Sequence, residues 1–196
     1  MTTDSGRSRR RKKPRKATPD ALERAALHYL QRYASSSENL RRVLMRRVLR
    51  SADAHGTDPE DGAAVIDGLI NRYQSSGLLD DANYARLRAE SLHRRGASNR
   101  LIRTRLMAKG VDAEDIDAAL TALDGLTMDT ELAAACNYAR RRRIGPWRRA
   151  DRDAYRERDL AALGRQGFGY DTARKVIEAE DPDELLAEAG GAANEL

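Results

Sequence analysis

The chain has 196 residues, of which 40% are hydrophobic, 34% charged and 5% aromatic, so it can bury only a thin core. Its 36 Lys and Arg against 31 Asp and Glu give a net charge of +5, which favours an anionic partner. No run is apolar enough to cross a membrane, and a single cysteine, Cys136, cannot form an internal disulfide, so we expect a soluble, cytoplasmic protein.

The first residues and those that follow differ sharply in pattern. Residues 1–17 are rich in Ser, Thr, Arg and Lys, a composition that buries too little apolar surface to offset the loss of chain entropy. We therefore predict a disordered basic N-terminal tail. From Pro19 onward apolar residues recur at helical spacing, beginning with Leu22 and Ala26, and alternation typical of strands is nowhere sustained. The sequence predicts an all-α protein.

Three helices are predicted in the first third of the chain. The first lies near residues 20–34, and apolar stripes then run from Leu40 to Val48 and from Val65 to Tyr73. The polar stretch between these two stripes, residues 51–62, is expected to be a loop.

Two later segments, Leu106–Leu120 and Leu163–Ile177, align without a gap. In each, a Leu near the end of a helix precedes a Gly and an apolar residue, and a second apolar stripe follows. A Gly that ends a helix in the left-handed conformation, with the next residue folded back on the last turn, explains this pattern. Phe168, the only Phe, is therefore predicted to be a packing residue.

A related pattern in the first third lacks this Gly and has Val48-Leu49 in its place. Leading helices are predicted near residues 81–95 and 129–143. The chain therefore predicts three tandem three-helix repeats that form an elongated curved array. The predicted boundaries are residues 18–78, 79–126 and 127–181, followed by an acidic C-terminal tail over residues 182–196.

Polar residues at the predicted helix starts are interpreted as N-caps. Asp80 or Asp81 serves this role better than that of a catalytic carboxylate pair, and the others are Ser37, Ser98, Asp112 and Asp171. No nucleophile motif or phosphate-binding loop is present, and His28, His55 and His93 lack metal-ligand spacing. We expect no enzyme activity, no cofactor and no metal, and a buried helical position for Cys136.

Basic residues are concentrated in the second and third predicted repeats. Arginines 140–143 point around most of a helix, so they cannot all be buried. They either pair with carboxylates on a solvated face or bind phosphates. Trp147 and Tyr138 are equally suited to stacking on bases and to core packing. The predicted DNA- or filament-binding residues are Arg94, Arg95, Arg100, Arg103, Arg105, Lys109, Arg140, Arg141, Arg142, Arg143, Arg148, Arg149, Arg165 and Lys175.

Over roughly residues 20–180 the chain resembles the RecX family of recombinase regulators. The resemblance rests on four segments in order: AALHYLQRYASSSENLRRVL, GLLDDANYARLRAES, RRGASNRLIRTRLMAKGV and RQGFGYDTARKVI. The second carries a Gly-apolar-apolar-Asp-Asp element, and the last carries Gly167-Phe168-Gly169-Tyr170. The basic and acidic tails lie outside the family pattern.

The resemblance implies a cytoplasmic, non-enzymatic protein of three three-helix repeats that binds RecA–DNA filaments. It implies inhibition of strand exchange, ATP hydrolysis and coprotease activity, through binding in the filament groove and opposition to filament growth. The expected partners are the RecA filament and single- and double-stranded DNA, with no membrane partner, and the expected state is a monomer. An alternative is a general helical DNA-binding protein that contacts phosphates without sequence specificity.

Overall fold

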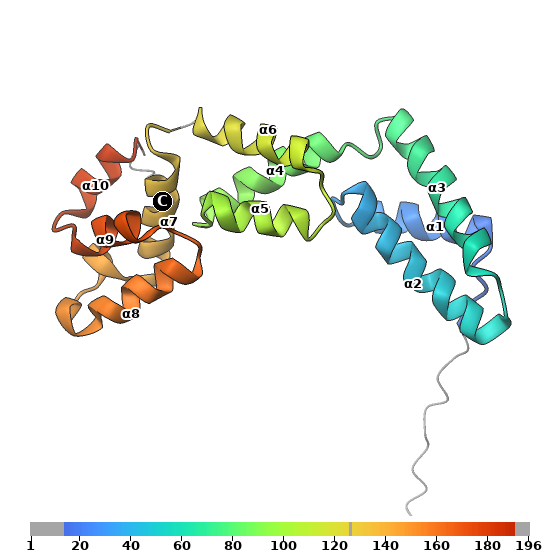
Figure 1. Cartoon of the computed structure of the whole chain (residues 1–196), viewed down its shortest axis with the longest axis horizontal. Coiled ribbons are helices and arrows are strands. Elements are labelled where there is room, and N and C mark those ends of the chain that lie inside the picture. Colours follow the sequence, from blue (N-terminus) through green and yellow to red (C-terminus); the bar gives the residue numbers. More distant parts are fainter. Residues whose placement is uncertain (1–13, 126, 191–196) are drawn as a thin grey trace, which may run out of the picture. The chain divides into compact units, whose positions relative to one another are not determined.

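The computed structural model describes residues 14–125 and 127–190, which form ten α-helices, one 3-10 helix and no strand (Figure 1). The prediction of an all-α protein is confirmed for these residues. Most of the predicted N-terminal tail, residues 1–13, lies outside them. Within the described ranges, no helix combines the length and the apolarity that crossing a membrane requires.

The described residues form two compact units. The first consists of the residues up to Leu79 apart from 36–38, and the second of residues 36–38 and those from Asp80 onward. The elongated curved array predicted from the sequence stays a prediction.

The first helix group lies in the first unit and consists of α1 (Pro19–Leu30), most of α2 (Ser37–His55) and α3 (Pro59–Ser75). Apolar side chains from all three helices enclose one cluster, with Leu22, Leu44 and Ile66 almost fully buried. This is the first of three such clusters in the described chain.

Helix α2 is longer than the sequence analysis predicted. The expected loop over residues 51–62 is wrong, because the chain is helical through His55 and again from Pro59. Ser51 is fully buried although it is polar, since its hydroxyl accepts a hydrogen bond from the Ala17 N–H (3.0 Å) and contacts the Thr57 hydroxyl (2.9 Å). Gly56, with a φ of +65°, follows the helix directly, so this group has the helix-ending glycine that the sequence analysis judged absent.

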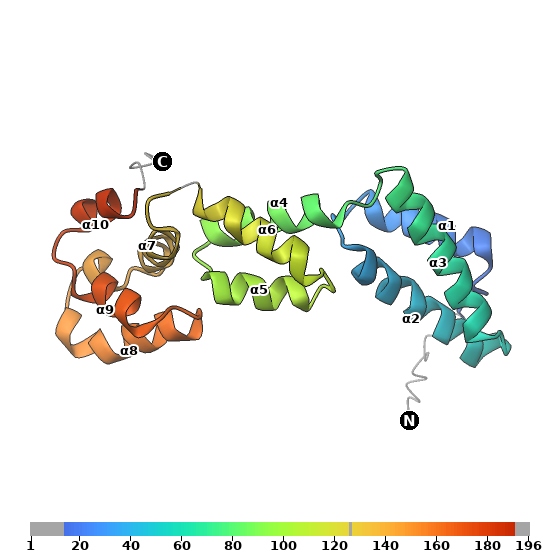
Figure 2. The ribbon, with the colours of Figure 1, turned by 45° about the horizontal axis from the view of Figure 1, so that its top comes forward.

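The second helix group consists of α4 (Asp81–Arg94), α5 (Asn99–Met107) and α6 (Ala113–Asp124) (Figure 2). These three helices enclose their own apolar cluster. Three of the proposed N-caps are confirmed, because the side chains of Asp80, Ser98 and Asp112 accept backbone N–H groups in the first turns of α4, α5 and α6. The interpretation of Asp171 was wrong: Gly169 occupies the N-cap position of α9, and Asp171 lies in the first turn. Ser37 is the first residue of α2.

The third helix group contains α7 (Thr130–Arg142), the 3-10 helix η1 (Gly145–Trp147), α8 (Arg152–Arg165), α9 (Tyr170–Glu178) and α10 (Pro182–Glu188). Residues 182–196 were predicted to be an acidic tail, so α10 is a correction to that prediction. This helix forms because Leu185 and Ala189 join the apolar cluster of the third group, and Glu188 pairs with Lys175 at 2.5 Å. Residues 191–196 lie outside the described part.

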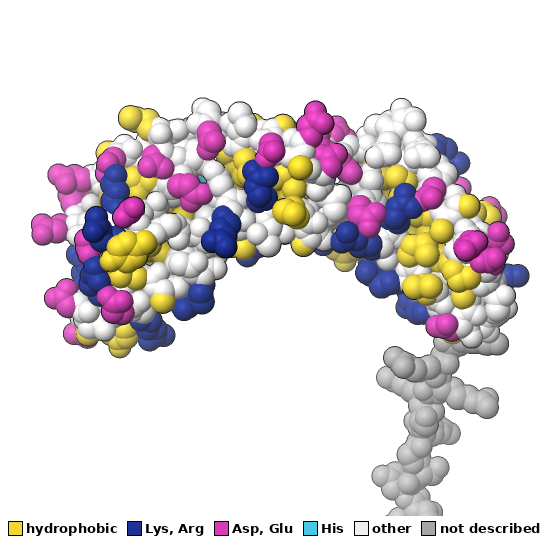
Figure 3. All heavy atoms as spheres, in the orientation of Figure 1, with side chains coloured by type: hydrophobic (Ala, Val, Ile, Leu, Met, Phe, Trp, Pro, Cys, Tyr) yellow, Lys and Arg dark blue, Asp and Glu magenta, His cyan; other side chains and the backbone are white. Residues whose placement is uncertain are grey.

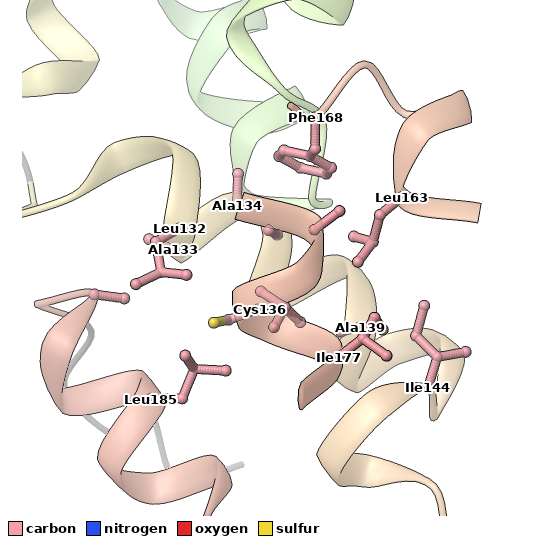
Figure 4. Close-up of a cluster of buried hydrophobic side chains, with 14 of the residues drawn as sticks. Leu132, Ala133, Ala134, Cys136, Ala139, Ile144, Leu163, Phe168, Ile177 and Leu185 are labelled. Atoms are coloured by element: carbon pink, nitrogen blue, oxygen red, sulfur yellow. The ribbon is translucent and has the colours of Figure 1, made fainter. Parts of the chain in front are cut away.

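Phe168 belongs to the apolar cluster of the third group, where its side chain is only 5% exposed. In Figure 4 the ring joins the side chains of Leu163 and Ala134 in this cluster. The predicted packing role is therefore confirmed. Cys136 lies in the same cluster with no exposed surface, and burial raises the pKa of its thiol to about 12. The thiol therefore stays protonated and unreactive at neutral pH.

Candidate nucleic-acid interface

The second and third helix groups meet at Gly96, which follows α4. A Cβ atom added to Gly96 would lie 2.5 Å from the backbone N of Tyr138 and 2.6 Å from its Cα, closer than any side chain can approach. The φ of Gly96 is +80°, a conformation that residues with a Cβ atom rarely adopt. Only glycine therefore lets the end of α4 approach the middle of α7 this closely.

Polar contacts reinforce this junction. The Ser98 hydroxyl donates to the Gln166 carbonyl (2.7 Å), and the Asn99 N–H donates to the Glu131 carboxylate (2.7 Å). The imidazole of His93 is buried with its Nε2 2.9 Å from the Thr130 carbonyl, so Nε2 carries the proton. Burial raises the pKa of Glu131, and the Asn99 N–H opposes this shift. Each group thus satisfies polar atoms of the other.

The junction brings together two basic stretches that are distant in the sequence. Arg94 and Arg95 lie at the end of α4, and Arg140, Arg141 and Arg142 lie in the last turn of α7. The Arg141 guanidinium donates to the Arg95 carbonyl (3.1 Å) and so joins the two stretches directly. We call these five residues the junction cluster.

The junction cluster carries positive charge that is not neutralised locally. Arg94, Arg95, Arg141 and Arg142 are exposed and Arg140 is half-buried. Within the part of the chain that the structure describes, none of the five forms an ion pair with a carboxylate. Guanidinium groups that have no carboxylate partner are suited to binding phosphate groups, with which they form paired hydrogen bonds.

Arg143 does not continue the helical run of arginines. It ends α7 in the left-handed conformation, with φ 54° and ψ 51°, and is followed by the buried Ile144 and Gly145. Its side chain is exposed, but its backbone no longer follows the helix that carries Arg140 to Arg142.

Three of the predicted binding residues are already paired. Arg103 contacts Asp117 and Lys175 contacts Glu188, each at 2.5 Å. Arg148 holds Asp159 with hydrogen bonds of 2.7 to 3.1 Å, and the side chain of Asp159 is only 4% exposed. Asp159 also accepts the Gly145 N–H (3.3 Å), so the pair joins η1 to α8.

This hydrogen bonding raises the pKa of Arg148, and its guanidinium lies 4.4 Å from the Tyr155 ring centroid. Arg148 therefore has a structural role in the third helix group.

The remaining predicted residues are dispersed. Arg100 lies beside the turn between α8 and α9, since a Cβ atom on Gly167 would be 3.5 Å from that of Arg100. Arg105 lies on α5, Arg149 lies between η1 and α8, and Arg165 lies in the last turn of α8; all four arginines are exposed. Lys109 follows α5 and is half-buried.

The two aromatic residues considered for base stacking are packed against the core rather than fully exposed to solvent. Trp147 and Tyr138 are half-buried against the apolar cluster of the third group, and the Arg142 guanidinium lies 6.0 Å from the Tyr138 ring centroid. Tyr155 and Tyr170 are the exposed aromatic residues in the described part of this group, at 37% and 63%. The exposure of these two rings was not predicted, because a lone Tyr in or beside a helix has no spacing that distinguishes an exposed ring from a packed one.

A set of exposed arginines on α2 is absent from the predicted binding residues, namely Arg42, Arg46, Arg47 and Arg50. Their spacing of three and four residues was the available signal, because it places them toward one side of a helix. Over the described ranges, no group of three His, Cys, Asp or Glu side chains is arranged to hold a metal ion.

Comparisons with known proteins connect this geometry to a family. The family profile described as RecX, second three-helix domain, matches residues 80–120, which cover most of α4 to α6. Regulatory protein RecX of Myxococcus xanthus is 43% identical over 90% of this chain and 94% of its own length. Regulatory protein RecX of Agrobacterium fabrum is 30% identical over 84% of this chain and 87% of its own. No solved structure matches significantly.

Proposed function

Because this chain belongs to the RecX family of regulatory proteins, we propose that it binds RecA–DNA filaments and inhibits their strand exchange, ATP hydrolysis and coprotease activity. The chain is a regulator rather than an enzyme. In this proposal it acts as a cytoplasmic monomer and modulates DNA repair and recombination. Its partners are the RecA filament and the single- and double-stranded DNA that such filaments contain.

The junction cluster is the observation that supports a DNA-containing target. It places five arginines from α4 and α7 together, and the described residues provide no carboxylate partner for them. Binding of arginine to phosphate releases condensed counterions, which favours association without reading a base sequence. A filament offers such phosphates next to protein carboxylates, and arginines can bind both.

The proposal is tested by titrating preassembled RecA–DNA filaments with this protein while DNA-dependent ATP hydrolysis is measured. A regulator that opposes filament growth acts at filament ends, so we expect inhibition well below one molecule per RecA subunit. Inhibition that begins only when the DNA is saturated would contradict the proposal. That result would favour the second candidate, a general DNA-binding protein, which the exposed arginines also support.

The junction cluster provides a sharper test through the salt dependence of DNA binding. The slope of log affinity against log salt concentration is negative for DNA binding. In the variant Arg94→Gln/Arg141→Gln, we expect the magnitude of this slope on duplex DNA to decrease by about 2, since each lost phosphate contact removes about 0.9. Fluorescence anisotropy at several salt concentrations measures this slope.

The control is Arg103→Gln, which removes a guanidinium group that is already paired with Asp117. We expect little change in its slope. A slope that falls equally per charge in both variants would show that net charge, rather than the junction cluster, determines binding.

A further inference from the structure

The outward face of α2 carries a line of arginines that the junction cluster does not include. Arg42, Arg46 and Arg50 are exposed and follow one another at intervals of four residues, so they lie near one another on one side of the helix. The buried line Leu40, Leu44 and Val48 precedes each of them by two residues, which is about 200° around the helix. Figure 3 shows Lys and Arg side chains gathered along α2 on the face in view.

The arginines on this face differ from the others in the same helix group. Arg41 pairs with Asp67, and Arg72 pairs with Glu23. Arg46, Arg47 and Arg50 form no ion pair with any carboxylate in the described part of the chain. Like charges four residues apart repel each other, so Arg46 and Arg50 oppose helix stability unless an anion binds to them. The Arg50 Nε donates to the Arg46 carbonyl (2.9 Å), which holds that side chain along the helix.

The segment before α1 adds two further cations. The Ala17 N–H donates to the Ser51 hydroxyl (3.0 Å), and the Pro14 carbonyl lies 2.7 Å from the Nε2 of His55. These contacts hold residues 14–17 against the last turns of α2. Arg15 and Lys16 within the segment are exposed, so two further cations lie near the C-terminal end of α2.

We infer that Arg42, Arg46, Arg47 and Arg50 form a second surface that binds the sugar–phosphate backbone of a nucleic acid. This inference rests on the proposed function, because it assigns another contact with the same DNA. The arginine line advances by about 6 Å at each step, which suits a polymer with regularly repeated charge. Leu49, 50% exposed, lies beside this line, and no amide side chain lies between the arginines to read base edges.

The test compares the full-length chain with Arg46→Gln/Arg50→Gln. We expect the magnitude of the salt slope of binding to decrease by about 2 on duplex DNA and by somewhat less on a single strand. Thermal unfolding should not move to a lower temperature, because both side chains are exposed and their mutual repulsion is removed. The single variants Arg46→Gln and Arg50→Gln should each lose about half of this slope. Arg72→Gln is the matched single control, because it removes a paired arginine of the same helix group.

The outcomes separate this inference from the proposed function. If the double variant keeps the slope of a DNA-binding wild type, the inference is wrong while the proposed function stands. If the double variant keeps DNA affinity but no longer inhibits filaments, the surface binds protein carboxylates, which overturns the choice of nucleic acid. A wild type that binds DNA but never inhibits RecA filaments contradicts the proposed function and leaves the phosphate-binding surface intact.

Discussion

Gly96→Ala is expected to lower the free energy of unfolding by about 2–5 kcal/mol, since the methyl group both occupies a left-handed position and meets a packed backbone. The added Cβ would lie 2.5 Å from the backbone N of Tyr138, and α4 and α7 must separate to admit it. The same displacement moves Arg95 away from Arg141, whose side chain donates to the Arg95 carbonyl. We therefore expect the variant to lose DNA affinity as well as stability.

Urea unfolding followed by circular dichroism measures the first effect, and anisotropy with duplex DNA measures the second. Gly164→Ala is the control, because its added Cβ meets nothing within 4 Å on α8. Replacing a glycine inside a helix should stabilise the protein by about 0.5–1 kcal/mol. A Gly96→Ala protein with wild-type stability and affinity would show that the close approach of α4 to α7 is not required.

Phe168→Ala is expected to cost about 3–5 kcal/mol of stability, since it removes a buried ring and leaves a cavity among residues that relax only in part. The ring belongs to a cluster that draws side chains from α7, α8, α9 and α10 (Figure 4). We expect filament inhibition to fall only as far as the variant unfolds. Thermal and urea unfolding, with inhibition measured on the folded fraction, check this expectation.

Tyr170→Ala is the control for Phe168→Ala, since it removes a ring of similar size that is 63% exposed and only two residues away. It should cost far less stability. A Phe168→Ala protein that is stable and folded but does not inhibit filaments would identify Phe168 as a contact residue and not a core residue.

Apolar periodicity was sufficient to predict the described helices other than α10, and much of the core. The repeated Gly-apolar pattern predicted the burial of Phe168, because such a turn is a local structure whose determinants are adjacent in the sequence. The loop expected over residues 51–62 was wrong for a nonlocal reason. Ser51 is buried in α2 because the Ala17 N–H provides a hydrogen bond from a segment that is 34 residues away.

The candidate site was predictable in composition but not in arrangement. In the sequence, Arg148 and Arg94 are equally basic, yet Asp159 on a neighbouring helix holds one of them and no described carboxylate holds the other. The role of Gly96 could not be predicted for a similar reason, since the backbone that leaves no room for a Cβ atom there is that of Tyr138 in another helix group. Arginines are easily counted, whereas their partners depend on tertiary contacts.

The polar contacts between the second and third helix groups limit which parts of this chain can be exchanged or moved to another protein. The N-terminus of α5 is completed by Glu131 of α7, and the Gln166 carbonyl that ends α8 is completed by Ser98. At this boundary, each group therefore depends on the other for a hydrogen-bond partner of a backbone group at a helix end. The second and third helix groups are thus not interchangeable modules, and a third group moved to another protein would need Ser98 and Asn99 to be moved with it.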